Sequence, residues 1–425
     1  MPTFSIHTLG CRTNQADSEQ LRQILLGAGF VEVPFGSPAD CAIVNTCTVT
    51  GEADRKSRQI LRRASRQAGT VVATGCGVAR RGGLESLPGA VLKLAPESRE
   101  QILELLGASD CLGGSALRYG LQAGRSRALL KVQEGCDHFC SYCIVPYVRG
   151  RSRSMPAGSL VEQARALEEA GHREIVLTGI HLAVWGRDLP ENPDLADLLD
   201  RLLQGTREVR FRLSSIEPMS FPHRILERMA HFPDRICPHL HLPLQHASDA
   251  ILKRMRRDYT WAEYDRLARD FLDSVPGACL TTDILVGFPG ETQGDFEILM
   301  GHLRTLPFLH LHVFAYSPRK GTAAAMYSDP VPESTRKSRS EQVIRLGERL
   351  ARAVRRRFRG QVRPVLVERA ADREGEWLGT ADNFLQVCFP GPPALLGRIV
   401  PVRLGLGEDG RLCGLPKGEE FASGR

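Results

Sequence analysis

The 425-residue sequence has no apolar run that approaches the roughly 18 residues a membrane-spanning helix needs. Its first residues also lack the basic, apolar and small-residue order of a signal peptide. We therefore expect a soluble, cytoplasmic protein with no membrane partner. Thiols are kept reduced in that compartment, so the twelve cysteines are not expected to form disulfides.

The chain as a whole is neither strongly acidic nor strongly basic, because its formal net charge is only +7. A charge of this size does not by itself establish a nucleic-acid partner. With 42% hydrophobic and 25% charged residues, the chain is long enough for two or three globular domains with buried cores.

Residues 1–115 alternate short apolar runs with helix-like stretches. Strands are expected at 3–8, 41–47 and 70–74, and helices at 14–28 and 52–67. This order predicts an α/β domain with a parallel sheet. The three apolar runs lead to Cys11, Cys47 and Cys76, which should then share the carboxyl edge of the sheet, where α/β sheets place ligands. Cysteines so far apart in sequence are alone a weak indication of a metal site.

The next part of the chain, residues 122–357, predicts a partial barrel. A glycine-rich linker is expected at 107–124. Six strand-like runs then alternate with helices, at 128–132, 175–178, 209–214, 239–242, 280–286 and 309–314. Six units fall short of the eight in a complete TIM barrel, so we expect a partial (β/α)6 TIM-like barrel with its site at the carboxyl ends of the strands.

Two further elements follow the barrel. A long helix is expected at 333–359, and between residues 333 and 363 Lys and Arg number eleven against three acids. Residues 358–423 combine β-rich runs with Gly and Pro turns, which predicts a small antiparallel β-barrel.

The strongest local motif is Cys136-x3-Cys140-x2-Cys143, directly after the first barrel strand. Three thiolates on one loop can bind three irons of a cubane and leave the fourth iron open. An open iron can bind and reduce S-adenosylmethionine, whereas a cluster with four cysteines suits electron transfer. Zinc is the main alternative, although a structural zinc site needs a fourth ligand. His138 lies within the loop, but we expect it to face outward or contact the substrate.

The loop resembles the signature of the radical-SAM superfamily, and its continuation through residues 144–154 resembles the methylthiotransferase branch. The segments around Cys11, Cys47 and Cys76 are similar to the cysteine-bearing N-terminal domain of that branch. The C-terminal barrel resembles its TRAM domain, an RNA-binding module. The likeness spans nearly the whole chain.

The resemblance implies two [4Fe–4S] clusters, with S-adenosylmethionine as cosubstrate. Cys136, Cys140 and Cys143 are the implied ligands of the catalytic, radical-generating cluster. Cys11, Cys47 and Cys76 are the implied ligands of a second cluster that carries the sulfur to be transferred. An electron-donor protein and a sulfur source are implied partners.

Several barrel residues are expected to contact S-adenosylmethionine by their position at strand ends. They are Thr178, Gly179, Ser214, Ser215 and the stretch from Gly287 to Glu291. Tyr142 is a candidate for packing on the adenine. Generic loop polarity, or a core position for Tyr142, explains each of them equally well. The other six cysteines, Cys41, Cys111, Cys237, Cys279, Cys388 and Cys413, are expected to be scattered thiols, mostly in apolar surroundings.

Three short segments, at 174–182, 212–218 and 316–322, resemble the group of the branch that modifies N6-threonylcarbamoyladenosine beside the tRNA anticodon. Arg149, Arg151 and Arg153 are candidates for reading the carboxylate of that substituent. Binding of phosphate and simple solvation are equal alternatives for them. Groups that modify isopentenyladenosine in tRNA or a ribosomal-protein aspartate remain alternatives, as does a non-catalytic RNA-binding Fe–S sensor. Arg355, Arg356, Arg357 and Arg359 can bind RNA phosphates, and a solvated helix face is the equal alternative for each of them.

Overall fold

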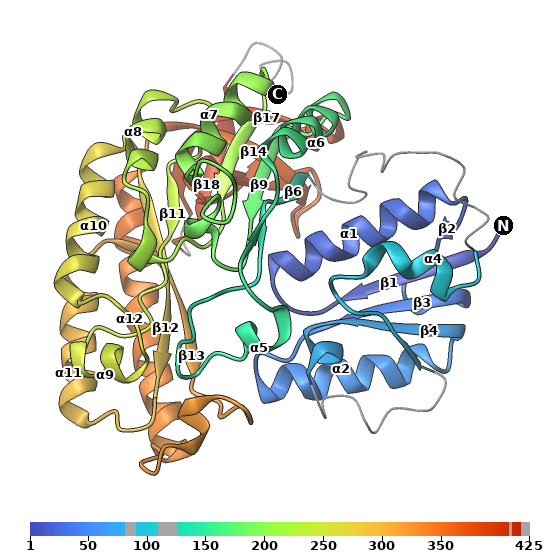
Figure 1. Cartoon of the computed structure of the whole chain (residues 1–425). Coiled ribbons are helices and arrows are strands. Elements are labelled where there is room, and N and C mark those ends of the chain that lie inside the picture. Colours follow the sequence, from blue (N-terminus) through green and yellow to red (C-terminus); the bar gives the residue numbers. More distant parts are fainter. Residues whose placement is uncertain (81–90, 109–125, 408–409, 418–425) are drawn as a thin grey trace.

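A computed structural model describes residues 1–80, 91–108, 126–407 and 410–417, which form three successive sheet systems. Figure 1 shows the N-terminal domain beside a central barrel, with the C-terminal barrel against the far end of the central one. The predicted fold class is confirmed. The predicted linker lies largely outside the described residues, as does Cys111, and the domain limits stay predictions. Within the described residues no helix is long and apolar enough to cross a bilayer.

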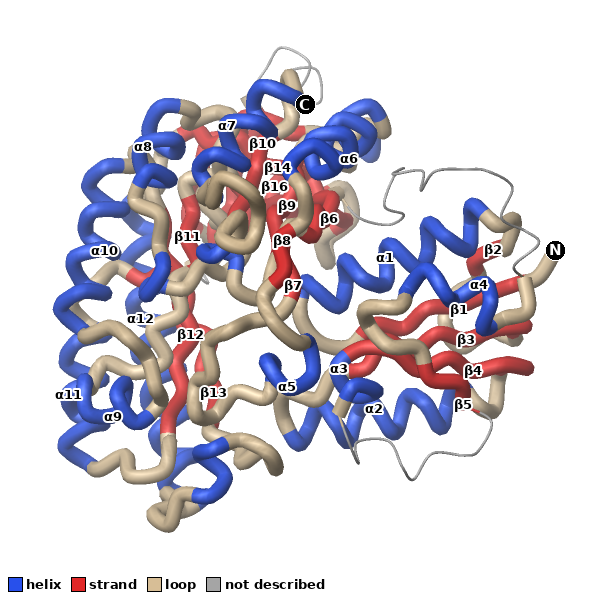
Figure 2. The backbone as a smooth tube through the Cα atoms, in the orientation of Figure 1, coloured by secondary structure: helices blue, strands red, loops and turns tan. Residues whose placement is uncertain are grey.

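The N-terminal domain has one parallel sheet in the order β2-β1-β3-β4-β5. Its central strand β3 is buried almost throughout, because helices cover both faces of the sheet. Figure 2 shows α1 and α2 on opposite faces. The elements are β1 (Thr3–Thr8), α1 (Arg12–Gly27), β2 (Val31–Glu32), β3 (Ala39–Thr46), α2 (Gly51–Ala64), β4 (Ala68–Gly75), α3 (Cys76–Ala79), β5 (Val91–Lys93) and α4 (Ile102–Leu105).

The central barrel has six parallel strands, paired as β6-β9-β10 and β11-β12-β13 and joined by isolated bridges between β10 and β11. Its strands are β6 (Arg127–Lys131), β9 (Glu174–Thr178), β10 (Arg210–Leu213), β11 (His239–His241), β12 (Cys279–Val286) and β13 (Phe308–Ala315). A short antiparallel pair, β7 (Gln133–Glu134) and β8 (Arg153–Ser154), brackets the loop that carries Cys136.

Helices on the outside of the barrel bury one side of each strand. The side chains between these helices and the strands form the largest hydrophobic core among the described residues, which includes Ala128 and Leu130 of β6. These helices are α6 (Ala157–Glu169), α7 (Leu195–Gly205), α8 (Arg224–His231), α9 (Asp249–Arg254), α10 (Trp261–Ser274), α11 (Gln293–Leu303) and α12 (Glu333–Arg357). The short helix α5 (Val145–Arg149) instead faces the N-terminal domain, where Val148 packs with Cys76. Capping boxes at Asp194, Thr260 and Thr292 fix the starts of α7, α10 and α11.

The open side of the barrel is covered by the N-terminal domain. Since Ala128 and Leu130 face the outer helices, the alternating residues Leu129 and Lys131 face the inside. Ala16 of α1 packs against Leu129 and against Val176 of β9. Helix α1 therefore belongs to the N-terminal domain by sequence and lines the barrel by position.

The C-terminal barrel is closed in the order β14-β15-β16-β18-β17. Its strands are β14 (Val362–Ala370), β15 (Glu376–Ala381), β16 (Gln386–Pro390), β17 (Ile399–Leu406) and β18 (Leu412–Pro416). One pair differs from the antiparallel barrel that we predicted, because β16 and β18 run parallel. After β16 the chain crosses to β17, which pairs with β14. Strand β18 then lies between β16 and β17 and completes the closed barrel.

A hairpin of this barrel docks into the amino-terminal end of the central barrel. Phe384 adopts a positive φ of 74° and stacks on His239, with ring centroids 4.3 Å apart. Arg212 donates to the Asp382 carbonyl at 2.9 Å and to the Ala381 carbonyl at 3.0 Å. The same guanidinium, like that of Arg210, is held by the buried carboxylate of Glu174. Glu174 thus balances the two cations that hold the C-terminal barrel in place.

We expect Glu174→Gln to loosen this docking strongly, because it leaves two buried arginines without their counter-charge, at a cost of about 3–5 kcal/mol. Hydrogen–deuterium exchange of residues 381–386 and the thermal midpoint would both report the loss. Glu208→Gln removes the exposed pair with Arg173 and serves as control, with an expected change within about 0.5 kcal/mol. Equal stability of the two variants would contradict the role assigned to Glu174.

Candidate active site

The cysteines of the N-terminal domain meet at the carboxyl edge of the parallel sheet, as expected from their place after the strands. The register pairs Thr8 with Asn45 and Thr46 with Gly75, so the three strands end together. The Asn14 Oδ1 atom lies 3.9 Å from the sulfurs of both Cys11 and Cys76. Cys47 and Cys76 are buried and Cys11 is exposed, and all three are free thiols.

Two glycines permit this convergence. Gly10 has a φ of 102°, and a Cβ atom there would lie 3.1 Å from the Cys47 sulfur. Gly75 has a φ of 84°, and a Cβ atom would lie 2.2 Å from the Asn45 side-chain oxygen. Only glycine fits at either position, and each directly precedes a cysteine.

The second set, Cys136, Cys140 and Cys143, lies on the loop between β7 and α5. The Cys143 backbone N–H donates to the Cys140 carbonyl at 3.0 Å, and the Cys136 N–H donates to the Gly150 carbonyl at 3.1 Å. Gln133 ties this loop to the end of β9, because its amide donates to the Gly135 carbonyl and its oxygen accepts the His181 N–H at 2.8 Å. The loop is therefore held in shape by backbone hydrogen bonds and by the Gln133 side chain.

Charged and polar side chains surround the second set. Arg257 Nη1 lies 3.6 Å from the Cys140 sulfur and pairs with Glu217. Burial acts to raise the pKa of Cys140, but a His138 hydrogen bond and the Arg257 charge outweigh it and lower that pKa. Burial raises the pKa of Cys136 to about 11. His138 is half-buried and shares a hydrogen bond with the Arg256 carbonyl at 2.7 Å, so it faces a neighbouring loop.

Two buried polar atoms beside this loop have no protein partner among the described residues: His181 Nε2 and Ser214 Oγ. His181 lies 3.7 Å from the Cys136 sulfur through its other ring nitrogen, and burial lowers its pKa to about 4. A buried polar atom without a partner is costly, so both atoms are suited to a polar ligand at the strand ends. The site thus fits a molecule such as S-adenosylmethionine.

The other residues predicted to contact S-adenosylmethionine differ in burial and in packing. Thr178 is buried, Ser215 is half-buried, and Gly179 packs on Gln133. Tyr142 packs edge-on against Phe288 within an apolar cluster. These residues stay predictions as ligand contacts.

Glu291 has protein partners that occupy its carboxylate. It accepts the Gly287 N–H at 2.6 Å and the Phe288 N–H at 3.2 Å, and it pairs with Arg339 of α12 at 2.6 Å. These contacts brace the loop that Gly287 begins. A direct contact of Glu291 with the ligand stays a prediction.

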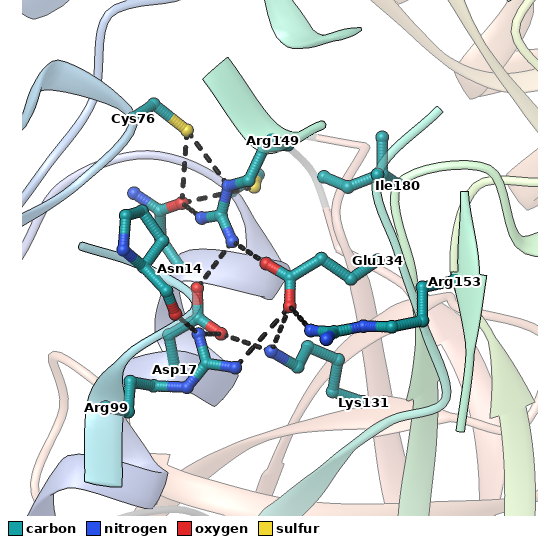
Figure 3. Close-up of polar contacts among 12 residues, drawn as sticks. Asn14, Asp17, Cys76, Arg99, Lys131, Glu134, Arg149, Arg153 and Ile180 are labelled. Atoms are coloured by element: carbon teal, nitrogen blue, oxygen red, sulfur yellow. Dashed lines mark hydrogen bonds and ion pairs between the residues drawn. The ribbon is translucent and has the colours of Figure 1, made fainter. Parts of the chain in front are cut away.

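Arg149 does not face the outside of the site, so its predicted role in reading a substrate carboxylate or phosphate is wrong. Its side chain is 0% exposed, and Figure 3 shows its guanidinium between the two domains. Nε donates to the Cys76 sulfur at 3.2 Å, and Nη1 lies 2.7 Å from both Asp17 and Glu134. Arg151 and Arg153, in contrast, are 78% and 58% exposed.

The buried network around Arg149 carries an excess of positive charge. Arg99, Lys131 and Arg149 are its buried cations, and Asp17 and Glu134 are its carboxylates, so three positive charges face two negative ones. Burial raises the pKa of Cys76 to about 11, whereas the Arg149 charge acts against that rise. A thiolate-bound, anionic group at Cys76 would neutralise the excess, so this site fits an iron–sulfur cluster.

A second ionic contact joins the domains on the other side of Cys47. Asp54 of α2 accepts from Arg80 at 2.6 Å and from Arg319 at 2.5 Å, and Arg319 also donates to Thr48 at 2.8 Å. Arg319 belongs to the 316–322 segment. That segment therefore contacts the N-terminal domain.

Sequence reasoning missed the polar partners of both cysteine sets. Asn14 and Glu217 lie within segments that we had singled out for family resemblance, and Gln133 and Glu134 directly precede the cysteine loop. No spacing rule in the sequence indicates their contacts. Among the described residues, no group of three or more His, Cys, Asp or Glu side chains is arranged to hold one metal ion. Each cysteine of a cubane binds a different iron.

The remaining described cysteines are isolated from both sets. Cys41, Cys237 and Cys279 are buried, Cys388 is half-buried and Cys413 is exposed. Cys388 and Cys413 are neighbours on β16 and β18 of the C-terminal barrel. The expectation of a buried thiol thus holds for the first three, although Cys237 lies 3.8 Å from the Glu174 carboxylate and so is not in apolar surroundings, and it does not hold for Cys413.

Family models match three segments of the chain. Residues 130–303 match the radical SAM superfamily, residues 3–90 match uncharacterized protein family UPF0004, and residues 356–405 match the TRAM domain. The chain is 35% identical to the threonylcarbamoyladenosine tRNA methylthiotransferase MtaB of Bacillus subtilis, over 95% of this chain and 94% of that protein. It is 34% identical to the tRNA-2-methylthio-N(6)-dimethylallyladenosine synthase of Moorella thermoacetica, over 95% of each chain.

Solved structures share the fold at low sequence identity. The radical S-adenosylmethionine methyltransferase TsrM from Kitasatospora setae has a TM-score of 0.53 at 14% identity, over 74% of this chain and 73% of that one. The cobalamin-dependent radical enzyme OxsB has a TM-score of 0.52 at 12% identity, over 80% of this chain and 56% of that one. Both similarities concern the fold alone.

We expect Glu134→Gln to weaken the contact between the N-terminal domain and the barrel, because three buried cations would then face Asp17 alone, at a cost of about 3–5 kcal/mol. Burial acts to raise the Glu134 pKa, but Lys131, Arg99 and Arg149 lower it to about 2. The carboxylate therefore stabilises the native protein above the ordinary pKa of a glutamate, and this contribution is lost as the pH falls through about 2.

Thermal midpoints measured between pH 2 and 7 should thus show a smaller loss on acidification in the variant than in the unmodified protein. Glu208→Gln is again the control, with an unchanged profile. If Glu134→Gln were as stable as the unmodified protein at pH 7, the network would not hold the domains together.

Proposed function

We propose, from the premise that this chain belongs to the radical-SAM tRNA methylthiotransferases, that it converts N6-threonylcarbamoyladenosine beside the tRNA anticodon to its 2-methylthio derivative. The family implies a [4Fe–4S] cluster and S-adenosylmethionine, and the TRAM domain and the tRNA-modifying relatives support a tRNA substrate. The finer substrate and a second cluster are our proposals.

The six cysteines divide the work in this proposal. Cys136, Cys140 and Cys143 hold the cluster that binds S-adenosylmethionine, and Cys11, Cys47 and Cys76 hold a second one. When bound, these groups supply the radical that removes the C2 hydrogen and the methylthio group that replaces it, with two S-adenosylmethionine molecules used per turnover. A reductant and a sulfur source are required from outside the chain.

The observation that carries the choice of substrate is Arg12, the residue after Cys11. Overall similarity favours the threonylcarbamoyladenosine group only narrowly, since relatives of the two adenosine groups are 35% and 34% identical to this chain. Arg12 has no hydrogen bond or ion pair to another described residue, and its guanidinium lies 6.0 Å from the centre of the Phe384 ring. Burial, with the charges of Arg127 and Arg212, lowers its pKa to about 10.

A desolvated cation without a partner favours an anion over an alkyl group. The threonylcarbamoyl substituent carries a carboxylate, and a dimethylallyl group carries none. Arg12 directly follows a ligand of the proposed sulfur-carrying cluster, and its guanidinium lies toward Phe384. The proposal therefore requires the N6 substituent to extend from that cluster toward Phe384 while C2 faces the cluster. Arg12 takes the role that we first assigned to Arg149.

The surface around the C-terminal barrel supports RNA binding. Arg356, Arg357 and Arg359 at the end of α12 are exposed, and Arg355 is half-buried. Arg355 lines a cavity of about 1160 Å³ between α12, β13 and the C-terminal barrel, together with His312, Arg373 and Phe384. Cations here can bind phosphates without reading sequence, while the target base leaves the loop stack at a cost of a few kcal/mol.

Nucleoside mass spectrometry tests the proposal directly. The reconstituted protein is incubated anaerobically with S-adenosylmethionine, a reductant, sulfide and tRNA that carries either modified adenosine. We expect one methylthio group to replace hydrogen on threonylcarbamoyladenosine. The same gain on dimethylallyladenosine alone would show that the substrate assignment is wrong. Formation of 5′-deoxyadenosine without any nucleoside product would point to a protein substrate.

Arg12→Gln should lower kcat/KM for threonylcarbamoyladenosine tRNA by about tenfold to 100-fold, because a hydrogen bond to a charged group contributes about 1.5–3 kcal/mol. Arg12→Lys keeps the charge and should retain much of the activity. Arg269→Gln removes an exposed cation of α10 that pairs with Asp265 and is the matched control. An unchanged preference between the two tRNAs in Arg12→Gln would exclude Arg12 as the reader of the carboxylate.

A further inference from the structure

Arg149 is the one side chain of the barrel domain for which a hydrogen bond to a cysteine of the N-terminal set is found among the described residues. It ends α5, six residues after Cys143, and so connects the loop of one cysteine set to a sulfur of the other. We propose that Arg149 is a positioning residue that raises the reduction potential of the cluster bound by Cys11, Cys47 and Cys76. This inference rests on the second cluster of the proposed function.

The contact geometry directs the guanidinium toward the sulfur. Asp17 and Glu134 each lie 2.7 Å from Nη1, so the two carboxylates share one nitrogen. Nη2 donates to Asn14 Oδ1, which leaves Nε for the Cys76 sulfur at 3.2 Å. Nε of Arg149, which neither carboxylate contacts, is therefore the donor to the Cys76 thiolate.

Asn14 extends the effect of Arg149 to a second sulfur. Its side-chain nitrogen donates to the Leu9 carbonyl at 2.7 Å and to the Thr46 carbonyl at 2.9 Å, which turns its oxygen toward Cys11 and Cys76. An amide oxygen next to two thiolates is unfavourable without a cation. Arg149 supplies that cation through its contact with the same oxygen.

The charge balance gives the direction of the effect. The buried network has three cations and two carboxylates, so one positive charge is left for the cluster. Positive charge and hydrogen bonds to the sulfurs both favour the reduced, more negative cluster and raise its potential. At the other cysteine set, Arg257 lies 3.6 Å from the Cys140 sulfur and is paired with its own carboxylate, Glu217. The uncompensated charge is thus specific to the N-terminal set.

Arg149→Gln suits the test because the protein should still fold. Without Arg149, two cations (Arg99 and Lys131) face two carboxylates (Asp17 and Glu134), so the buried network becomes neutral. The amide of glutamine keeps a hydrogen-bond donor for its neighbours. Arg149→Lys retains the charge and loses the planar fork of donors.

The experiment uses the full chain with Cys136, Cys140 and Cys143 all changed to alanine, so that only the N-terminal cysteines can hold a cluster. After anaerobic reconstitution with iron and sulfide, iron content is measured, and the midpoint potential is obtained from a redox titration followed by electron paramagnetic resonance. We expect a more negative potential in Arg149→Gln, an intermediate value in Arg149→Lys, and no change in the control Arg151→Gln.

A full iron content with an unchanged potential in Arg149→Gln would overturn the role of Arg149 and leave the second cluster intact. If Arg149→Gln loses its iron, the Arg149→Lys variant provides the test. A shifted midpoint potential in that variant supports the role of Arg149, and an unshifted potential rejects it. If the parent triple-alanine protein binds no iron, the second cluster is absent, and the proposed function fails together with this inference.

Discussion

The buried contact of Arg149 with Asp17, Glu134 and Cys76 is the interaction on which the arrangement of the site depends. The two cysteine sets lie on separate domains, and among the described residues buried ion pairs connect one domain to the other. Buried charges must be paired with good geometry, and this requirement favours the observed relative position of α1, β7 and α5. The same residues that hold the domains together thereby set the environment of a cysteine sulfur.

The incomplete barrel explains why three domains meet inside it. A six-stranded barrel leaves one side of its inner surface uncovered, and polar strand residues there need partners. Helix α1 supplies them from the N-terminal domain, through Ala16 on Leu129 and Asp17 on Lys131. Phe384 supplies them from the C-terminal barrel, stacked on His239. Arg12 reaches the same region, which places a cation between the RNA-binding module and the cysteines.

This arrangement favours a substrate that spans the molecule. Exposed arginines at the end of α12 lie beside the C-terminal barrel, and the cysteine loop lies at the opposite ends of the barrel strands. An RNA held by its phosphates at one end can extend a single base toward the cysteines at the other. In the proposed function, the phosphate backbone and the target base would thus be recognised at separate places.

The sequence by itself determined the three fold units and the positions of most of the main strands, and it singled out both cysteine sets, whereas the short strands β2, β5, β7, β8 and β18 were not predicted. Alternating apolar runs report strands directly, and cysteines at strand ends or at short spacing need no long-range information. The prediction for Arg149 was wrong because nothing in the local sequence distinguishes a cation that turns inward from exposed neighbours such as Arg151 and Arg153. Its partners Asn14 and Asp17 lie more than 130 residues away. Only tertiary structure brings such residues together, since charge pairing depends on where surfaces meet and leaves no periodic pattern in the chain.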